Sequence, residues 1–112
     1  MRKLEVIIRP ERIDEIRAAL DKKGIKGLTV TEVVGAGNQG GRPQTYRGHT
    51  FELLLLPKVK VEIVVDDRMV EDVVEVLCKA ARTGEVGDGK IFIYPVEDVV
   101  RIRTGERGLA AV

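Results

Sequence analysis

Hydrophobic and polar positions follow one plan twice along this chain. Residues 6–9, Val-Ile-Ile-Arg, are matched by residues 63–66, Ile-Val-Val-Asp. The apolar positions that come next share a helical spacing, and they are Ile13, Ile16 and Leu20 in the first copy and Val70, Val73 and Leu77 in the second. Each copy predicts a strand, a helix and a second strand, so the whole chain predicts a duplicated βαβ unit.

In the first copy, the alternation of Leu4, Val6 and Ile8 with polar residues predicts a strand. Pro10 suits the first position of a helix, because the N–H that it lacks has no intrahelical partner there. Residues 22–24, Lys-Lys-Gly, are typical of a helix end. The β-branched residues over 28–34 predict the second strand.

The second copy repeats this order with a clearer pattern. Alternating apolar residues predict a strand over 58–65, and Asp66 or Asp67 is expected to cap the next helix. The apolar positions of that helix are Val70, Val73, Val74, Leu77, Ala80 and Ala81. We expect Gly84 to end the helix and residues 91–94 to form the fourth strand, with Pro95 as its stop.

Two linked βαβ units of this length predict a single domain over 1–112 with an α+β, ferredoxin-like fold, in which both helices cover one face of a four-stranded antiparallel sheet. The open face would carry Ile7 and Val64 among charged residues, which are Lys3, Glu5, Arg9, Lys58, Lys60 and Glu62. An oligomer that covers this face with ion pairs would account for the mixture, and a solvated sheet with two isolated aliphatic residues is the alternative.

Composition narrows the class of protein. The 112 residues include 19 Lys+Arg and 18 Asp+Glu, a near-neutral balance that argues against a dedicated nucleic-acid protein. The longest apolar run, Leu53–Leu56, is far too short to span a membrane, so no direct membrane insertion is expected. A single cysteine, Cys78, and a single histidine, His49, argue against a disulfide framework and against a Cys/His metal site within one chain.

Residues 36–57 join the two copies without a clear period. Four glycines and two arginines lie in this segment, and a loop of such length in a small domain is usually functional or mobile. One interpretation is an arm that presents Tyr46 and Arg47 to a partner. The other is a tolerated flexible insertion.

A second irregular segment, Gly84–Lys90, is rich in glycine and ends in lysine. Glycines let successive backbone N–H groups converge on an anion, and the lysine adds charge. A Walker A loop is rejected, because Ile91 replaces the Mg²⁺-binding hydroxyl residue and the predicted order is helix, loop, strand. A plain helix cap and turn is the alternative to anion binding.

Arg101 and Arg103 are two residues apart, so in an extended backbone both side chains would lie on the same side. Two guanidinium groups so placed suit a polyphosphate, and a solvated or salt-bridged tail is the alternative. No catalytic set of nucleophile, base and orienting acid stands out in the sequence, and Cys78 is interpreted as a small hydrophobic residue, so no enzymatic activity is expected.

Four segments in order resemble the PII nitrogen-regulatory signalling proteins, close to the GlnK type that partners ammonia channels. The most specific are residues 83–92, TGEVGDGKIF, and 57–62, PKVKVE, with supporting matches at 29–33 and 101–105. The resemblance covers essentially the whole chain. It implies a ferredoxin-like homotrimer that binds ATP or ADP between subunits, takes up 2-oxoglutarate together with Mg-ATP, and regulates an ammonium transporter.

The same resemblance divides the chain into named loops and implies a location. Residues 37–55 would be the T-loop that enters or blocks partners, residues 82–90 the B-loop that holds phosphates, and residues 102–108 the C-loop. The protein would be cytoplasmic, and peripherally associated with a membrane only when bound to the transporter.

Individual positions acquire roles from the resemblance. Those implied to bind nucleotide are Gly27, Thr29, Gly35, Gly37, Asn38, Gln39, Val64, Gly87, Asp88, Gly89, Lys90, Arg101 and Arg103. Those implied to bind 2-oxoglutarate are Arg9, Gln39, Gly40, Gly41, Lys58 and Gly87. Gln39 would also ligate Mg²⁺ through its side-chain oxygen. Tyr46, Arg47 and Gly48 would contact the partner, with Arg47 entering the channel pore.

The chain departs from the family pattern at several positions. Phe51 stands where many relatives carry a modified tyrosine, so uridylylation or adenylylation is not expected there, and His49 replaces a serine that some relatives phosphorylate. Asn38 and Gly40 replace cationic residues of many relatives, which bears on the 2-oxoglutarate response. Two other interpretations stay open: a PII-type regulator of nitrogenase or of a biosynthetic enzyme, and a small ferredoxin-like enzyme that uses a nucleotide.

Overall fold

The computed structural model describes residues 1–36 and 55–112 in full, and the backbone of 44–46 and 49–51. Its strands are β1 (Arg2–Ile8), β2 (Thr29–Ala36), β3 (Gln44–Tyr46), β4 (His49–Phe51), β5 (Leu55–Val65) and β6 (Gly89–Pro95). Its α-helices are α1 (Ile13–Lys22) and α2 (Val70–Ala81), each preceded by a short 3-10 turn, Pro10–Arg12 and Asp67–Met69 respectively.

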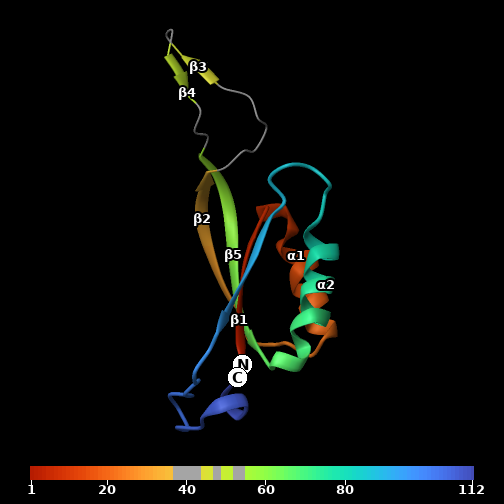
Figure 1. Cartoon of the computed structure of the whole chain (residues 1–112), viewed down its shortest axis with the longest axis vertical. Coiled ribbons are helices and arrows are strands. Elements are labelled where there is room, and N and C mark those ends of the chain that lie inside the picture. The colour runs from red at the N-terminus through yellow and green to blue at the C-terminus, as the bar shows by residue number, and fades with distance from the viewer. Residues whose placement is uncertain (37–43, 47–48, 52–54) are drawn as a thin grey trace.

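The main sheet has the strand order β2-β5-β1-β6, and every neighbouring pair is antiparallel. Both α-helices pack on one face of this sheet, and none of the described residues forms an α-helix over the other face (Figure 1). This arrangement is the ferredoxin-like α+β sandwich that the duplicated βαβ pattern predicts, so the predicted fold class is confirmed.

The core lies between the helices and the sheet, where the alternating residues of β1 and β5 meet the apolar stripes of α1 and α2. Its buried members are Leu4, Val6, Ile8, Ile16, Leu20, Val59, Val61, Ile63, Val65, Val70, Val73 and Leu77. Each of these side chains contributes roughly 1.5–3 kcal/mol through burial, so the repeated pattern of apolar positions is also the main source of stability.

The helix boundaries follow local chemistry and correct one expectation. Pro10 opens the 3-10 turn before α1, and α1 ends at Lys22, just before Gly24 at φ +77°. The Asp66 carboxylate accepts a hydrogen bond from the Arg68 N–H at 3.0 Å and so caps the turn before α2. The prediction that Gly84 ends this helix is wrong, because α2 ends at Ala81, with the Arg82 N–H bonded to the Cys78 carbonyl.

Other strand boundaries also differ from the predicted ones. β2 covers 29–36 and not 28–34, and β6 begins at Gly89 and includes Pro95, which is tolerated because it is the last residue of an edge strand. The predicted irregular segment 36–57, with the loop implied over 37–55, is shorter in the structure. Leu55 pairs with Ala36, and the β3–β4 pair lies inside the segment, so the expectation of a segment without regular structure is wrong.

The C-terminal segment contradicts the expected extended backbone at Arg101 and Arg103. Val100 pairs with Arg107, the Arg101 N–H donates to the Glu106 carbonyl, and the Gly105 N–H donates to the Arg101 carbonyl. These bonds close a tight turn over 101–106, and they form because Gly105 adopts φ +73°. Arg101 also pairs with Glu106 at 3.1 Å, while Arg103 is exposed.

The helix-free face of the sheet carries ion pairs within the chain itself. The Lys3 ammonium lies 3.0 Å from the Glu62 carboxylate, and Lys60 lies 3.7 Å from both Glu5 and Glu62. Lys3 also lies 5.4 Å from the centroid of the Tyr94 ring. Among the described residues, no helix is long and apolar enough to cross a membrane.

Candidate functional site

The clearest candidate site is an open pocket on the helix-free face, at the end of the sheet where β1 ends and β6 begins. It has a volume of about 540 Å³. Its walls come from the ends of β1, β2, β5 and β6 and from the loop between α2 and β6, and include Gly35, Lys58, Val86, Gly87, Lys90 and Phe92. Four chain segments that are separated in the sequence therefore meet at one place.

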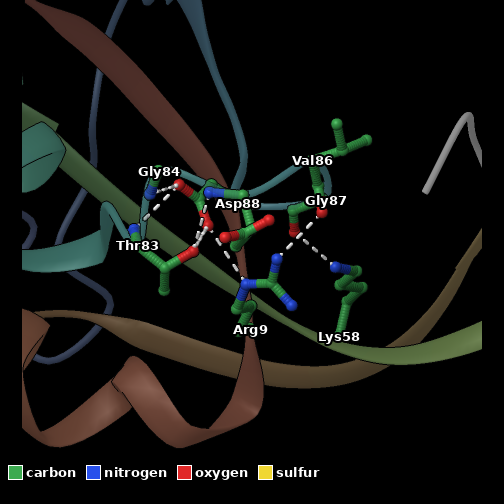
Figure 2. A network of polar contacts seen from close by, with 8 residues as sticks. Arg9, Lys58, Thr83, Gly84, Val86, Gly87 and Asp88 are labelled. Carbon is green, nitrogen blue, oxygen red and sulfur yellow. Dashed lines mark hydrogen bonds and ion pairs between the residues drawn. The ribbon is translucent and has the colours of Figure 1, made fainter. Parts of the chain in front are cut away.

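The loop between α2 and β6 is held from within by the Asp88 carboxylate (Figure 2). One of its oxygens accepts hydrogen bonds from the backbone N–H of Thr83 at 2.8 Å and of Gly84 at 2.9 Å. The other accepts from the Thr83 hydroxyl and from Arg9 Nε, the latter at 3.1 Å. These bonds, first of all the one from the Thr83 hydroxyl, hold the pKa of Asp88 far below its ordinary value of 3.8.

Two cations from the sheet hold the carbonyl groups of the same loop. Arg9 Nη2 donates to the Val86 carbonyl at 2.9 Å, and Lys58 Nζ donates to the Gly87 carbonyl at 2.6 Å (Figure 2). Lys58 is only 8% exposed, and burial, with the charge of Arg9 as a second cause, lowers the pKa of its ammonium. The carboxylates of Glu11 and Asp88 act on this pKa in the opposite direction, but neither forms an ion pair with Lys58 among the described residues, so the buried ammonium suits an anionic ligand.

The loop also keeps hydrogen-bond donors for a ligand. The Glu85 N–H donates to the Thr83 hydroxyl at 3.1 Å, whereas the N–H groups of Val86 and Gly87 have no acceptor among the described residues. Gly87 adopts φ +98°, which lets adjacent N–H groups face one anion. Lys90 is exposed on the pocket wall and forms no ion pair within the described part of the chain.

One glycine is needed at this place because a side chain would not fit. A Cβ on Gly89 would lie 1.7 Å from the Ile7 carbonyl oxygen, whereas a Cβ on Gly35 would lie 3.3 Å from Lys58 Cγ, a close contact that a shift of a few tenths of an ångström would relieve. The close approach of β6 to β1 therefore depends on Gly89.

The structure brings seven of the predicted site residues to this end of the sheet: Arg9, Gly35, Lys58, Gly87, Asp88, Gly89 and Lys90. It places five others toward the opposite end, where β1 begins and β6 ends: Gly27, Thr29, Val64, Arg101 and Arg103. Figure 1 shows this separation between the loop before β6 and the C-terminal segment after it. The two arginines and the glycine loop do not form one site within a single chain.

The remaining predicted residues lie outside the residues that are fully described. These are Gly37, Asn38, Gln39, Gly40, Gly41, Arg47 and Gly48, together with Tyr46 and Phe51, for which the backbone places only a position in β3 and β4. The predicted ligand of Mg²⁺, Gln39, is among them. Groups of three or more His, Cys, Asp or Glu that could hold a metal ion are absent from the described residues.

Sequence reasoning missed Thr83 as a structural part of the site and gave Asp88 only a ligand role. The signal was present in the sequence, since a hydroxyl residue and an aspartate that flank a glycine-rich turn are typical of side-chain caps on backbone N–H groups. Cys78 is free and half-buried on α2, as its interpretation as a small hydrophobic residue predicts.

The fold and the pocket together define a small ferredoxin-like α+β domain with a braced, glycine-rich loop that can receive an anion. The family of nitrogen regulatory protein P-II matches residues 1–106, and the chain belongs to this family. The predicted family membership is thereby confirmed.

Individual relatives agree over the full chain. A nitrogen regulatory protein P-II from Nostoc punctiforme is 56% identical, and one from Azospirillum brasilense is 53% identical, over all 112 residues and over the whole of each relative. A nitrogen regulatory protein P-II 2 from Methanothermobacter thermautotrophicus is 54% identical over the whole of this chain and 97% of its own length. The protein therefore has a role in nitrogen signalling, and it is a regulator and not an enzyme.

Proposed function

We propose that the protein senses ATP and ADP by holding their phosphate groups on the loop between α2 and β6. The observation that carries this proposal is the pocket in which the N–H groups of Val86 and Gly87 lie beside Lys58 and Lys90. The exposed Lys90 ammonium and two backbone N–H groups without an acceptor among the described residues suit a polyanion, and glycine keeps the backbone open to close approach.

The same proposal assigns 2-oxoglutarate to the end of the pocket near Lys58 and Arg9. Lys58 is buried, donates to the Gly87 carbonyl and forms no ion pair among the described residues, so a ligand carboxylate would supply the opposite charge that a buried ammonium favours. Gly40 and Gly41 belong to this proposed site by sequence alone. With Mg-ATP bound, Mg²⁺ held in part by Gln39 would supply a cation to the phosphate and carboxylate oxygens.

The proposed assembly is a homotrimer in which Arg101 and Arg103 of one subunit complete the site of its neighbour. Support comes from their place at the far end of the sheet from Lys90, which leaves a neighbouring copy as their route to the same ligand. The proposed target is an ammonium transporter, contacted by Tyr46, Arg47 and Gly48 from the central segment. The protein would then act in the cytoplasm and reach a membrane only through that transporter.

Calorimetric titration with 2-oxoglutarate, in Mg-ATP, in Mg-ADP and without nucleotide, tests the ligand proposal. We expect binding with Mg-ATP, and loss of nucleotide binding in the Lys90→Ala variant. Lys26→Ala is a matched control, because that exposed lysine lies on the far side of α1 from the pocket and pairs with Asp21. Absence of nucleotide binding by the unmodified protein would refute the proposal, whereas nucleotide binding without 2-oxoglutarate binding would reduce it to an adenylate sensor.

A mixing experiment tests the shared site. Lys90→Ala subunits and Arg103→Ala subunits should each bind ATP poorly, and refolding the two together should restore a minority of the sites. No restoration, with assembly of both variants shown by their mass in solution, would contradict a site shared between subunits. Co-purification of the protein with membranes that contain an ammonium transporter, lost on Arg47→Ala, tests the target.

A further inference from the structure

We infer that Asp88 and Arg9 are positioning residues that hold the loop of residues 83–88 in its anion-receiving shape before any ligand binds. The inference rests on the proposed function, since it concerns the same phosphate site. It reassigns Asp88, which the sequence alone places among the ligand contacts, to a role inside the loop.

The hydrogen bonds of Asp88 leave its carboxylate little capacity to meet a ligand. Its two oxygens together accept four bonds, from the Thr83 N–H and hydroxyl, the Gly84 N–H and Arg9 Nε (Figure 2). Two lone pairs per oxygen are thereby used. A carboxylate also repels a nearby phosphate unless a cation neutralises its charge. The Arg9 guanidinium neutralises the Asp88 carboxylate, with Nε 3.1 Å from its oxygen.

The guanidinium of Arg9 holds the loop at two separate points. Nε donates to the Asp88 carboxylate and Nη2 donates to the Val86 carbonyl at 2.9 Å, so one planar group connects two residues of the loop. The Arg9 side chain is 17% exposed, and its backbone is itself fixed, because the Arg9 carbonyl accepts the Arg12 N–H at 3.0 Å as the chain turns into α1. A lysine at this position would offer a single ammonium nitrogen in place of the two guanidinium nitrogens that meet the two acceptors here.

The bracing has a consequence for binding. With Thr83 and Gly84 bonded to Asp88 and the Val86 carbonyl bonded to Arg9, the N–H groups of Val86 and Gly87, which have no acceptor in the described part of the chain, are held in place without a ligand. Binding then avoids the free-energy cost of ordering the loop. Removing the contacts of Asp88 or Arg9 should therefore weaken phosphate binding, even though neither side chain touches the phosphate.

Three variants separate this role from a general loss of folding. Asp88→Asn can still offer one oxygen to the two backbone N–H groups, but its amide nitrogen then faces the Arg9 Nε–H, so it breaks the link to Arg9. Arg9→Lys keeps the positive charge but loses the two guanidinium nitrogens that make the two contacts. Asp66→Asn is the matched control, because Asp66 makes the same contacts, with a backbone N–H and a guanidinium, at the start of α2.

Two measurements are made on the full-length protein and each variant. Calorimetry with ATP and with adenosine should show ATP affinity reduced about tenfold for Asp88→Asn and Arg9→Lys, with adenosine affinity unchanged, because only the phosphates meet the loop. Amide hydrogen exchange without ligand should show faster exchange at Thr83 and Gly84 in both variants. Asp66→Asn should change neither quantity.

The outcomes are distinct. Equal ATP affinity in the unmodified protein and both variants overturns the inference, and so does exchange at Thr83 and Gly84 that is as fast in the unmodified protein as in the variants. Parallel loss of ATP and adenosine affinity also overturns it, since that result indicates a damaged fold. If the unmodified protein binds no ATP, the proposed function fails on its own, and the exchange measurement still decides whether the brace exists.

Discussion

The junction between the glycine-rich loop and β6 makes Gly89→Ala the sharpest test of the fold. Gly89 adopts φ +114°, in a region that residues with a side chain rarely occupy, and its ideal Cβ would lie 1.7 Å from the Ile7 carbonyl oxygen. The neighbouring atoms are backbone, so no flexible side chain can move aside. Either the loop or the end of the β1–β6 pairing must shift.

The expected loss follows from two contributions. The backbone conformation costs about 1–3 kcal/mol for a residue with a Cβ. Moving β6 from Ile7 by more than 1 Å, the order of the overlap, gives up one or two hydrogen bonds of the ladder at about 1 kcal/mol each. Gly89→Ala should therefore lower the free energy of unfolding by about 2–5 kcal/mol.

Urea unfolding followed by circular dichroism measures this loss, at one fixed protein concentration because assembly would add to the apparent stability. Gly24→Ala is the matched control. Gly24 has φ +77° but no atom within 4 Å of its ideal Cβ, so it reports the backbone cost alone, about 1–2 kcal/mol. If Gly89→Ala lowers the free energy of unfolding by no more than Gly24→Ala does, the close approach to Ile7 adds no cost to the substitution and the reasoning is refuted.

Three further substitutions probe other parts of the chain. Leu77→Ala, at a fully buried position of α2, should lower the free energy of unfolding by about 2–5 kcal/mol, while Glu71→Ala on the exposed side of that helix should change it by less than about 0.5 kcal/mol in urea titrations. Hydrogen bonds from the Arg68 side chain and backbone hold the pKa of Asp66 at about 2, below its ordinary 3.8. The stability that Asp66 provides is present above pH 3.8 and is lost as the pH falls toward 2. The difference in free energy of unfolding between the unmodified protein and Asp66→Asn should therefore shrink between these two pH values in acid denaturation. Lys58→Met should leave the free energy of unfolding unchanged or raise it by about 1 kcal/mol, since it removes a buried charge, yet abolish 2-oxoglutarate binding in calorimetry; a clear loss of stability would contradict the idea that Lys58 is kept for a ligand.

The sequence predicts the fold well because the core residues recur at the regular spacings of strands and helices. Leu4, Val6 and Ile8 alternate, Val70, Val73 and Leu77 recur with helical spacing, and all six are buried. The errors occur where capping or pairing hydrogen bonds decide a boundary. α2 ends at Ala81 although Gly84 lies nearby, and β5 extends back to Leu55 because Ala36 pairs with it.

The site is predictable only in part, for a physical reason. Glycines and a lysine indicate an anion-binding loop, but sequence spacing does not show which acceptors and donors the loop uses on itself. The Asp88 carboxylate accepts hydrogen bonds from Thr83 and Gly84 within the loop, whereas the N–H groups of Val86 and Gly87 have no acceptor among the described residues. Arg9 reaches this loop from 79 positions away in the chain, a contact that only the strand order brings about.

The strand order also limits what one subunit can bind. β6 runs for seven residues from the glycine-rich loop to Pro95, which separates the two ends of the sheet by roughly 20 Å at ~3.3 Å per residue. The C-terminal segment, which includes Arg103, lies beyond the far end of β6, where Val100 pairs with Arg107 around a tight turn, so this segment and Gly87 lie at opposite ends of the sheet in one subunit (Figure 1). If Arg103 and Gly87 bind one nucleotide, the ligand lies between two copies of the chain, and its binding is then linked to assembly. A subunit in isolation keeps the loop of residues 83–88, but it cannot bring Arg101 and Arg103 to the phosphates that this loop would hold.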